Sequence, residues 1–223
     1  MAKVTKDQAE IEKLQQESAF LRTQAQALEL ATRRKALKLE RELHESNILR
    51  ASNVENRVYD FAVEVSGFST EATIQVLSRW ARLSNEPITL RFSSPGGSVF
   101  AGLGLYDAVL GLREKYKIKV RSVTLGMAAS MAAILLQCGD VRVISPNAYF
   151  LVHEVSSNAI GKVSEMEDET KFAQKINNRL FDILAARAKV SRRTIATHAK
   201  RRDWWLDAEE CLKFGFADEI GYV

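Results

Sequence analysis

The stretch VTLGMAASMAAILLQCGD, residues 123–140, joins a strand-like run to a helix-like run, and a single serine, Ser130, lies near the junction. This hydroxyl group is surrounded in the sequence by alanines and methionines. Such a serine is either a small residue that packing tolerates, a helix cap, or a group held in place for chemistry. The rest of the chain has to distinguish these interpretations.

Strand-like and helix-like segments alternate on both sides of this junction. Strands are expected at RVYDFAVEVSG (57–67), PITLRFSSPGG (87–97), KVRSVTLG (119–126) and, as a pair, VRVISPNAYFLVHE (141–154). Helices are expected at 69–85, 101–116, 130–139, about 162–189 and 191–202, with a last one preceded by the capping pair Asp207 and Glu210. Repeated strand and helix units predict an α/β fold in which helices cover a largely parallel sheet.

The N-terminal quarter of the chain has a different texture. Residues 1–66 contain neither glycine nor proline, and the first fifty are rich in helix formers, so a long helix is predicted. Leucines recur every seven residues at Leu14, Leu21 and Leu28, and the same spacing continues from a shifted position at Leu30 and Leu37. In a coiled coil, the second row of residues facing the partner helix would be Ile11, Ser18 and Ala25. Residues 1–54 are therefore interpreted as a helical extension, either a coiled coil or a solvated helix that frays alone, and residues 55–223 as the main domain.

Composition narrows the class of protein. The net charge of +4 among 223 residues, 27% of them charged, gives no reason to expect nucleic acid or a membrane as a partner. The two cysteines, Cys138 and Cys211, lie far apart, which argues against a disulfide framework or a zinc site. The start of the chain lacks the apolar core of a signal peptide, and no run is long enough to span a bilayer. We expect a soluble, cytoplasmic protein.

Functional groups of a parallel sheet gather at the carboxyl ends of its strands. Three such ends are predicted here: Pro95-Gly96-Gly97, the approach to Ser130, and His153. A serine needs a base to become a nucleophile, and His153 is the histidine that follows an apolar strand. His44 and His198 lie in charged helical surroundings and are expected to be surface residues.

The remaining parts of such a site can also be assigned. Asp203 is a candidate to fix the tautomer of His153, although it could equally pair with Arg201 or Arg202. Backbone N–H groups at Gly96 and Gly97 can approach a substrate carbonyl, although Pro-Gly-Gly would also form an ordinary turn. The Walker lysine, the dinucleotide fingerprint and a metal-ligand cluster are all missing, so we expect no cofactor and no metal.

Taken together, SSPGGSVFAGLGLYDA, GMAASMAAILLQCG, AYFLVHE and RRDWWLDAEECLKFGFADEI resemble the proteolytic subunit of the Clp protease family, over roughly residues 57–221. The resemblance implies a ClpP/crotonase-like fold and a serine endopeptidase with Ser130 as nucleophile, His153 as base and Asp203 as orienting acid. It also implies an oxyanion hole from the N–H groups of Gly96 and Met131, with the turn at Gly97 and Ser98 receiving an extended substrate strand.

The resemblance further implies an assembly. In the family, the helix corresponding to about 162–189 is a handle that joins two stacked seven-membered rings around an enclosed chamber, and substrates are polypeptides. The chain departs from the family pattern in three places. Glu154-Val155 replaces Gln-Pro after the histidine, Arg201 replaces an acidic residue before Arg202-Asp203, and some fifty helical residues replace a short axial segment that contacts a hexameric AAA+ unfoldase.

The extension suggests a phage head-maturation protease that is tethered to scaffold or capsid precursors in the host cytoplasm. Two alternatives remain open. One is a crotonase-like acyl-CoA enzyme, which the Ser-His-Asp set disfavours. The other is a catalytically latent or idle ring that acts as a scaffold or assembly element through its N-terminal helix.

Overall fold

The computed structural model describes residues 6–156 and 160–222, and within the first helix it describes the side chains of residues 13–15, 17–39 and 42. The side chains of Ile11 and His44 therefore lie outside the described part. The contacts divide the chain into two units, Met1–Leu49 and Arg50–Val223, which are treated separately below.

The described part of the first unit lies in one helix, α1 (Lys6–Ala51), whose last two residues belong to the second unit, and this helix confirms the long helix predicted from the sequence. Its described side chains are exposed along the whole length, leucines included. Lys38 and Glu42, one turn apart, form an ion pair at 3.8 Å within the helix. An uninterrupted run of good helix formers explains the helix, but nothing within the described part of this unit buries its apolar side chains.

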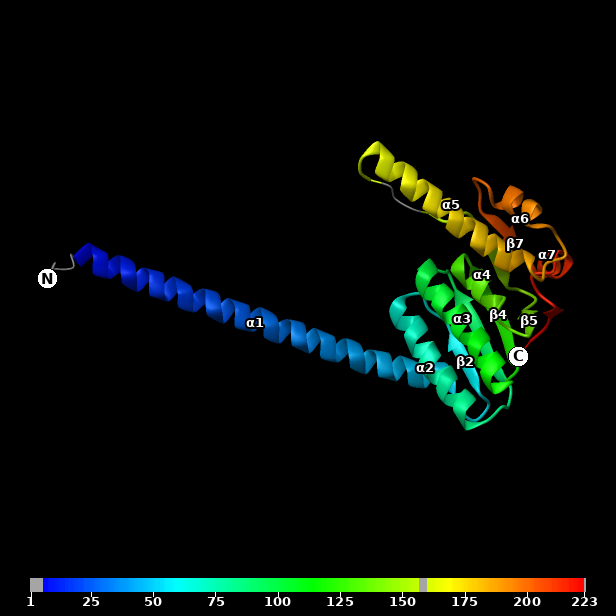
Figure 1. Ribbon diagram of the computed structural model, residues 1–223. Coiled ribbons are helices and arrows are strands. Elements are labelled where there is room, and N and C mark those ends of the chain that lie inside the picture. The colour runs from blue at the N-terminus through cyan, green and yellow to red at the C-terminus, as the bar shows by residue number, and fades with distance from the viewer. Residues whose placement is uncertain (1–5, 157–159, 223) are drawn as a thin grey trace. The chain divides into compact units, whose positions relative to one another are not determined.

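The second unit is built on a mixed sheet that is mostly parallel, as predicted (Figure 1). Its described strands are β1 (Ser52–Asn53), β2 (Val58–Phe61), β3 (Ile88–Ser94), β4 (Val120–Ala129), β5 (Val141–Ile144), β6 (Tyr149–Val152), β7 (Trp204–Leu206) and β8 (Glu219–Ile220). They pair in the order β1-β2-β3-β4-β5-β8, and β6 joins β4 and β7. Among these described strands, only the pairs β1·β2 and β6·β7 are antiparallel.

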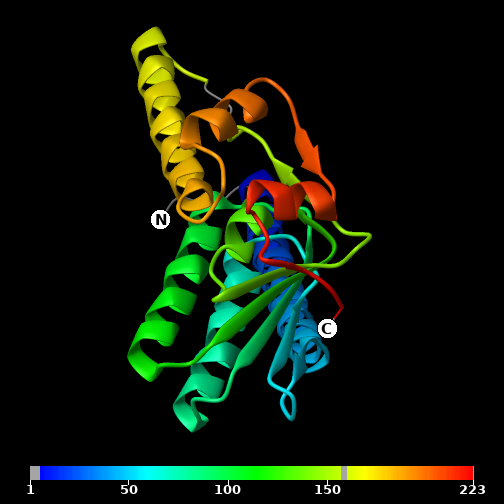
Figure 2. The same cartoon turned by 90° about the vertical axis from the view of Figure 1, so that its right-hand side faces the viewer.

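Helices pack against this sheet, and one of them extends from it (Figure 2). They are α2 (Gly67–Leu83), α3 (Val99–Tyr116), α4 (Met131–Leu136), α5 (Val163–Ala185), α6 (Arg192–Ala199) and α7 (Ala208–Phe214). The predicted capping pair is present, since Asp207 and Glu210 cap each other's backbone N–H groups at the start of α7, and Gly215 ends that helix in the left-handed conformation. The first half of α5 is exposed to solvent, and its second half packs on the domain.

The core lies between the sheet and these helices. Large apolar side chains from four strands and from α2, α3 and α4 are fully buried, among them Phe61, Leu77, Phe92, Leu105, Leu135 and Phe150. Phe150 of β6 stacks on Phe216, with ring centroids 5.3 Å apart, which ties the C-terminal segment to the sheet. The mixed α/β fold expected for the resemblance is thus confirmed.

Candidate active site

Ser130 lies where a distorted strand turns into a short helix. Strand β4 pairs regularly with β3 up to Phe92 and Thr124, and the register then shifts, so that Ser94 pairs with Ala128. Two extra residues of β4 are accommodated at this shift, where Gly126 has a φ of +65°. The irregularity lets β4 continue past the end of β3 and carry Ser130 out of the regular ladder.

The backbone of Ser130 is in an uncommon conformation for a residue with a side chain, with φ +56° and ψ −120°. Its N–H donates to the carbonyl of Leu151 at 3.0 Å, and its carbonyl accepts from Ala133 at 3.0 Å. The hydroxyl does not cap α4. Sharp, strained strand-to-helix turns of this kind expose a nucleophilic serine in hydrolases, and strain of this type costs about 1–3 kcal/mol. The helix-cap interpretation of Ser130 is therefore wrong.

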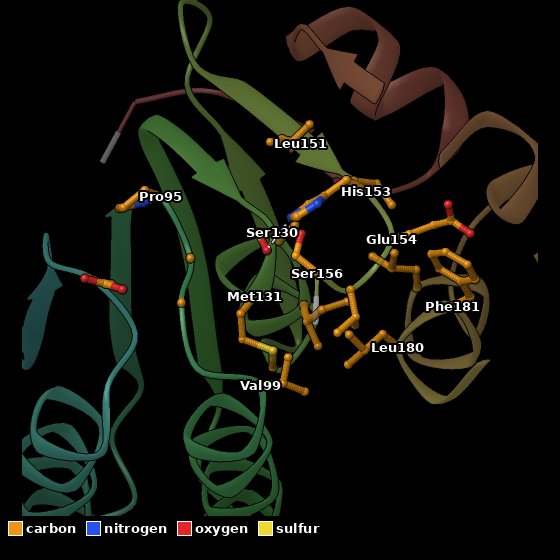
Figure 3. A pocket seen from close by; sticks show the side chains of 18 residues that line it. Pro95, Val99, Ser130, Met131, Leu151, His153, Glu154, Ser156, Leu180 and Phe181 are labelled. Carbon is orange, nitrogen blue, oxygen red and sulfur yellow. Dashed lines mark hydrogen bonds between the residues drawn. The ribbon is translucent and has the colours of Figure 1, made fainter. Parts of the chain in front are cut away.

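His153 reaches Ser130 because β6 runs parallel to the last residues of β4. Ala129 pairs with Leu151, and His153 lies two residues beyond Leu151, one residue past the position beside Ser130. The Nε2 atom of His153 lies 2.7 Å from the Oγ atom of Ser130, and both residues are partly exposed (Figure 3). This distance is that of a hydrogen bond between a serine and a base. His198, by contrast, stacks on Trp204 at 4.4 Å and contributes nothing to this pair.

The Pro-Gly-Gly turn lies directly against the serine. A Cβ atom at Gly96 would come within 2.6 Å of the carbonyl oxygen of Ala129 and 2.7 Å of the Cβ atom of Ser130. Gly96 and Gly97 have φ values of +96° and +140°, which favour glycine. Close approach, not flexibility, therefore explains glycine at position 96.

Backbone N–H groups of the Pro-Gly-Gly turn and of the first residue of α4 border the same cavity as Ser130, where the sequence predicts an oxyanion hole. The N–H of Gly96 donates weakly to Ser94 Oγ, at 3.3 Å, while its carbonyl accepts from Val65 at 2.7 Å. The N–H groups of Gly97 and of Met131, the first residue of α4, make no hydrogen bond within the described residues. Ser98 caps α3 through a hydrogen bond from Ala101 at 3.4 Å. The resemblance assigned the donor to Gly96, and the weak bond from its N–H to Ser94 could not be predicted because it depends on the conformation of the turn.

A cavity of about 350 Å³ opens beside the pair of Ser130 and His153. One wall carries the Pro-Gly-Gly turn and Ser130, and the opposite wall is the second half of α5 (Figure 3). Apolar side chains dominate the interior, namely Val99, Met131, Ile134, Leu180, Phe181 and Leu184. The sequence predicted the helix that carries the α5 residues but did not assign them to the site.

Asp203 is close to His153 but not bonded to it. Both residues border a second, shallow depression together with Glu154 and Arg201, yet Asp203 is exposed and makes no hydrogen bond or ion pair within the described residues. The loop before it is held by Glu154, whose Oε2 atom accepts from the N–H of Arg201 at 3.0 Å. Arg201 itself has a φ of +60°. The structure thus brings two of the three predicted catalytic side chains into contact and leaves the third nearby.

The described residues contain no candidate metal site, no readily reactive cysteine and no candidate membrane-spanning helix. No group of three histidine, cysteine or acidic side chains there could hold a metal ion. Cys138 and Cys211 are free and buried, and burial raises the pKa of Cys138 to about 12, so neither thiol is a ready nucleophile. In the same part of the chain, none of the helices combines the length and apolar character of a membrane span.

A serine held at a strained strand-to-helix turn, with an imidazole nitrogen on its hydroxyl and free N–H groups beside it, is the arrangement of a serine hydrolase. Comparison with known proteins identifies the family. A family model described as Clp protease matches residues 40–222, more than half of the chain. The chain therefore belongs to the Clp protease family.

Individual relatives agree with this assignment. The chain is 33% identical over 135 residues to the "ATP-dependent Clp protease proteolytic subunit" of Bacteroides fragilis, a match that covers 60% of this chain and 63% of the relative. The same identity is found with the protein of that name from Bacteroides thetaiotaomicron, over 60% of this chain and 59% of the relative. The matched segment thus spans about three fifths of the length of these relatives.

Proposed function

We propose that the protein is a serine endopeptidase in which Ser130 is the nucleophile and His153 the general base. The observation that carries this proposal is the 2.7 Å contact between His153 Nε2 and Ser130 Oγ at a strained turn beside an apolar cavity. Membership of the Clp protease family supports the reaction class. No metal ion or cofactor is required for it.

In the proposed mechanism, His153 removes the hydroxyl proton as Ser130 Oγ attacks the carbonyl carbon of a peptide bond. Negative charge then develops on the carbonyl oxygen and is stabilised by the oxyanion hole. The Met131 N–H serves as one donor, and the Pro-Gly-Gly turn supplies the other, from Gly96 as the resemblance implies or from the unoccupied N–H of Gly97. His153 next protonates the leaving amine, and water releases the acyl group by the reverse sequence of proton transfers.

The substrates are polypeptides that bind in extended form along the turn at Gly97 and Ser98. The cavity beside Ser130 is apolar and has room for one large side chain. Cleavage after apolar residues is therefore the preference that this cavity supports, because a charged side chain would lose hydration among its apolar side chains, and an acidic one would also be repelled by Glu64 and Glu154 in the lining.

Asp203 completes the proposed site as the residue that orients His153. It accepts no hydrogen bond from the imidazole here, and a shift of the 200–203 loop would be needed to bring the two side chains together. This same observation favours the second candidate function, a latent ring that acts as an assembly element until a partner aligns the triad. The two functions differ in whether Ser130 reacts in the isolated protein.

The wider biological setting is also proposed. A homo-oligomeric ring, stacking of rings through α5, and a role in phage head maturation with scaffold or capsid proteins as partners are consistent with family membership and with the helical extension. An AAA+ unfoldase is the alternative partner. Two free, buried thiols suit a reducing compartment such as the host cytoplasm.

The test is labelling of the purified full-length protein with a fluorophosphonate probe, with mass spectrometry to locate the adduct. We expect an adduct on Ser130 that disappears in Ser130→Ala and falls at least about 100-fold in His153→Ala. His198→Ala is the matched control and should label normally. A folded, assembled protein that never labels, alone or with candidate partners, would contradict the peptidase proposal and favour the assembly element.

A further inference from the structure

The helix α1 carries two rows of residues at seven-residue spacing, which together are called the seam here, and the leucines in them are exposed. Leu14, Leu21, Leu28 and Leu39 are between 57% and 70% exposed. The first three are seven residues apart, and Leu39 continues the companion row of Ser18, Ala25 and Thr32, also seven residues apart. Residues 13–39 lie outside the segment that matches the Clp protease family, so the family resemblance does not account for this seam.

The shape of this seam fits a second helix. On the surface of α1, the row of Leu14, Leu21 and Leu28 runs beside a row of smaller residues, Ser18, Ala25 and Thr32. The smaller residues leave hollows between the leucines. One hollow is present as a shallow recess lined by Leu14, Glu17, Ser18, Leu21, Arg22 and Ala25. In coiled coils a side chain of one helix enters a hole formed by four residues of the other, and this recess contains such a set.

We infer that α1 pairs with the α1 helix of a second copy of this chain, and that the two helices run antiparallel. In the antiparallel arrangement, a residue from the leucine row of one helix lies opposite a residue from the second row of the other helix. Each such pair is called a seam layer here. Leu21 then meets Thr32 of the second copy, Leu28 meets Ala25, and Leu14 meets Leu39. Each leucine thus faces a small side chain, or a leucine near the end of the seam, and Lys35 faces Ser18 instead of a second lysine.

Charges beside the seam select this direction. In the antiparallel pair, Glu17 lies beside Lys38 of the second copy and Arg22 lies beside Glu29, and symmetry produces each ion pair twice. All four side chains are exposed, and among them only Lys38 has a partner in the described part of its own helix, Glu42 at 3.8 Å. Ion pairs at these flanking positions set the orientation of coiled-coil partners.

The parallel arrangement is poorer on the same grounds. It keeps one kind of flanking ion pair, Glu17 with Arg22 of the second copy, but places Lys35 against Lys35 in the seam. It also stacks the basic run of residues 33–38 on itself. Like charges at close range destabilise such a pair. The inference does not rest on the peptidase proposal, since no residue of the candidate active site takes part in it.

The deciding experiment is disulfide cross-linking of the full-length variant Ser18→Cys/Lys35→Cys. These two positions occupy one seam layer in the antiparallel pair, and the native cysteines are buried. Mild oxidation and mass spectrometry of the linked peptides should show mainly links between positions 18 and 35. Links of 18 to 18 and of 35 to 35 would indicate a parallel pair and overturn the inference.

The matched control places cysteines on the outer face of the same helix. Positions 23 and 30 of Thr23→Cys/Leu30→Cys would lie at the same level along the antiparallel pair, as 18 and 35 do, but on the outer face, and Leu30 is nearly as exposed as the seam leucines, at 52%. A link yield in the seam variant no higher than in this control would also overturn the inference and point to a different partner for α1. Labelling of Ser130, measured on the same samples, reports separately on the proposed peptidase.

Charge reversal provides an independent readout. Glu17→Lys and Lys38→Glu should each lower the concentration-dependent association measured by sedimentation, and the double variant should restore it. A parallel pair would not recover in the double variant, because residue 17 would then face Arg22 of the second copy with like charge. Recovery by the double variant thus supports the antiparallel pair, and its failure contradicts it.

Discussion

At the scale of single residues, the shape of the candidate site depends on how closely the glycine turn approaches Ser130. Gly96 leaves no room for a Cβ atom, since the Ala129 carbonyl oxygen, the Ser130 Cβ atom and the Met131 nitrogen all lie within 2.9 Å of where that atom would be. All three belong to the backbone or to the base of a side chain, so they cannot yield without displacing the nucleophile. The turn and the serine are therefore one structural unit.

This geometry predicts that Gly96→Ala lowers the rate of fluorophosphonate labelling at Ser130 by at least about 100-fold, because displacing a reacting group by about 1 Å has that effect. Gly104→Ala is the matched control. Gly104 lies exposed on α3, and no atom lies within 4 Å of the position that its Cβ would take, so this substitution should leave labelling unchanged and stabilise the protein by about 0.5–1 kcal/mol. Equal labelling of the two variants would contradict the role assigned to the turn.

Glu154 links the histidine segment to the loop that carries Asp203, through its hydrogen bond with the Arg201 N–H. Removing this carboxylate in Glu154→Ala should release the loop and lower kcat for peptide hydrolysis by about fivefold, the effect of about 1 kcal/mol, with little change in KM. Glu154→Gln retains an acceptor oxygen and should restore most of the rate. A rise in KM with no change in kcat would show that Glu154 contacts substrate and does not position the loop.

At the scale of elements, the site depends on strand register. Sequence patterns were sufficient to predict that the strands before Ser130 and His153 end near each other, because parallel strands present their carboxyl ends at one edge. They could not show the shift in β4 that carries Ser130 beyond the end of β3, since one extra pair of residues in a strand leaves no periodic signal. Strand β7 was also missed, because Trp204–Leu206 is too short to show alternation.

His153 and Asp203 also differ in how well their positions could be predicted from the sequence. His153 is positioned by a strand, and its contact with the serine follows from pairing of Ala129 with Leu151. Asp203 lies in a loop, just before β7, where Arg201 has a positive φ. Loop conformation depends on a few local hydrogen bonds, such as that from Arg201 to Glu154, and these cannot be read from residue order. The parts of the site that directly follow strands, including the Pro-Gly-Gly turn, were therefore predictable, and the placement of Asp203 in its loop was not.

A charged network joins the ends of several elements and makes stability depend on pH. Asp218 accepts hydrogen bonds from the buried Arg142 of β5 and from Arg187 beyond α5. Burial opposes ionisation of Asp218, but the hydrogen bonds and positive charges of the two arginines outweigh it and hold the pKa of this carboxyl group below its usual value. A carboxyl group with a lower pKa in the folded state stabilises that state at neutral pH.

This contribution should be complete above about pH 5 and be lost as the pH falls through about 4 toward the lower pKa of the folded state. Asp218→Asn should therefore cost about 2 kcal/mol in the free energy of unfolding at pH 7, and less at pH 3, as measured by urea denaturation. Asp107→Asn, an exposed change on α3, is the control and should have no such pH dependence. The same loss for Asp218→Asn at both pH values would exclude the charge as its cause.

At the scale of the whole molecule, the chain combines a unit that has its own core with a helix that does not. Every buried apolar side chain identified among the described residues lies between Tyr59 and Ala217. The family match begins at residue 40, and the exposed seam of α1 precedes it. Folding of the unit that matches the Clp protease family and association through α1 are therefore expected to be separable properties.

A chain that begins at residue 50 tests this separation. It retains β1 and the whole core, so its Tm should stay within about 2 °C of the full-length value and Ser130 should label at the same rate. A chain that begins at Val58 is the comparison. It lacks β1 and also Arg57, which donates a hydrogen bond to Ser84 Oγ at 2.5 Å and whose carbonyl accepts from Thr89 at 2.9 Å, so its Tm should fall by several degrees. If the longer chain instead lost labelling along with its association, α1 would be required for an active arrangement of Ser130 and His153, and the assembly itself would then control the reactivity of the site.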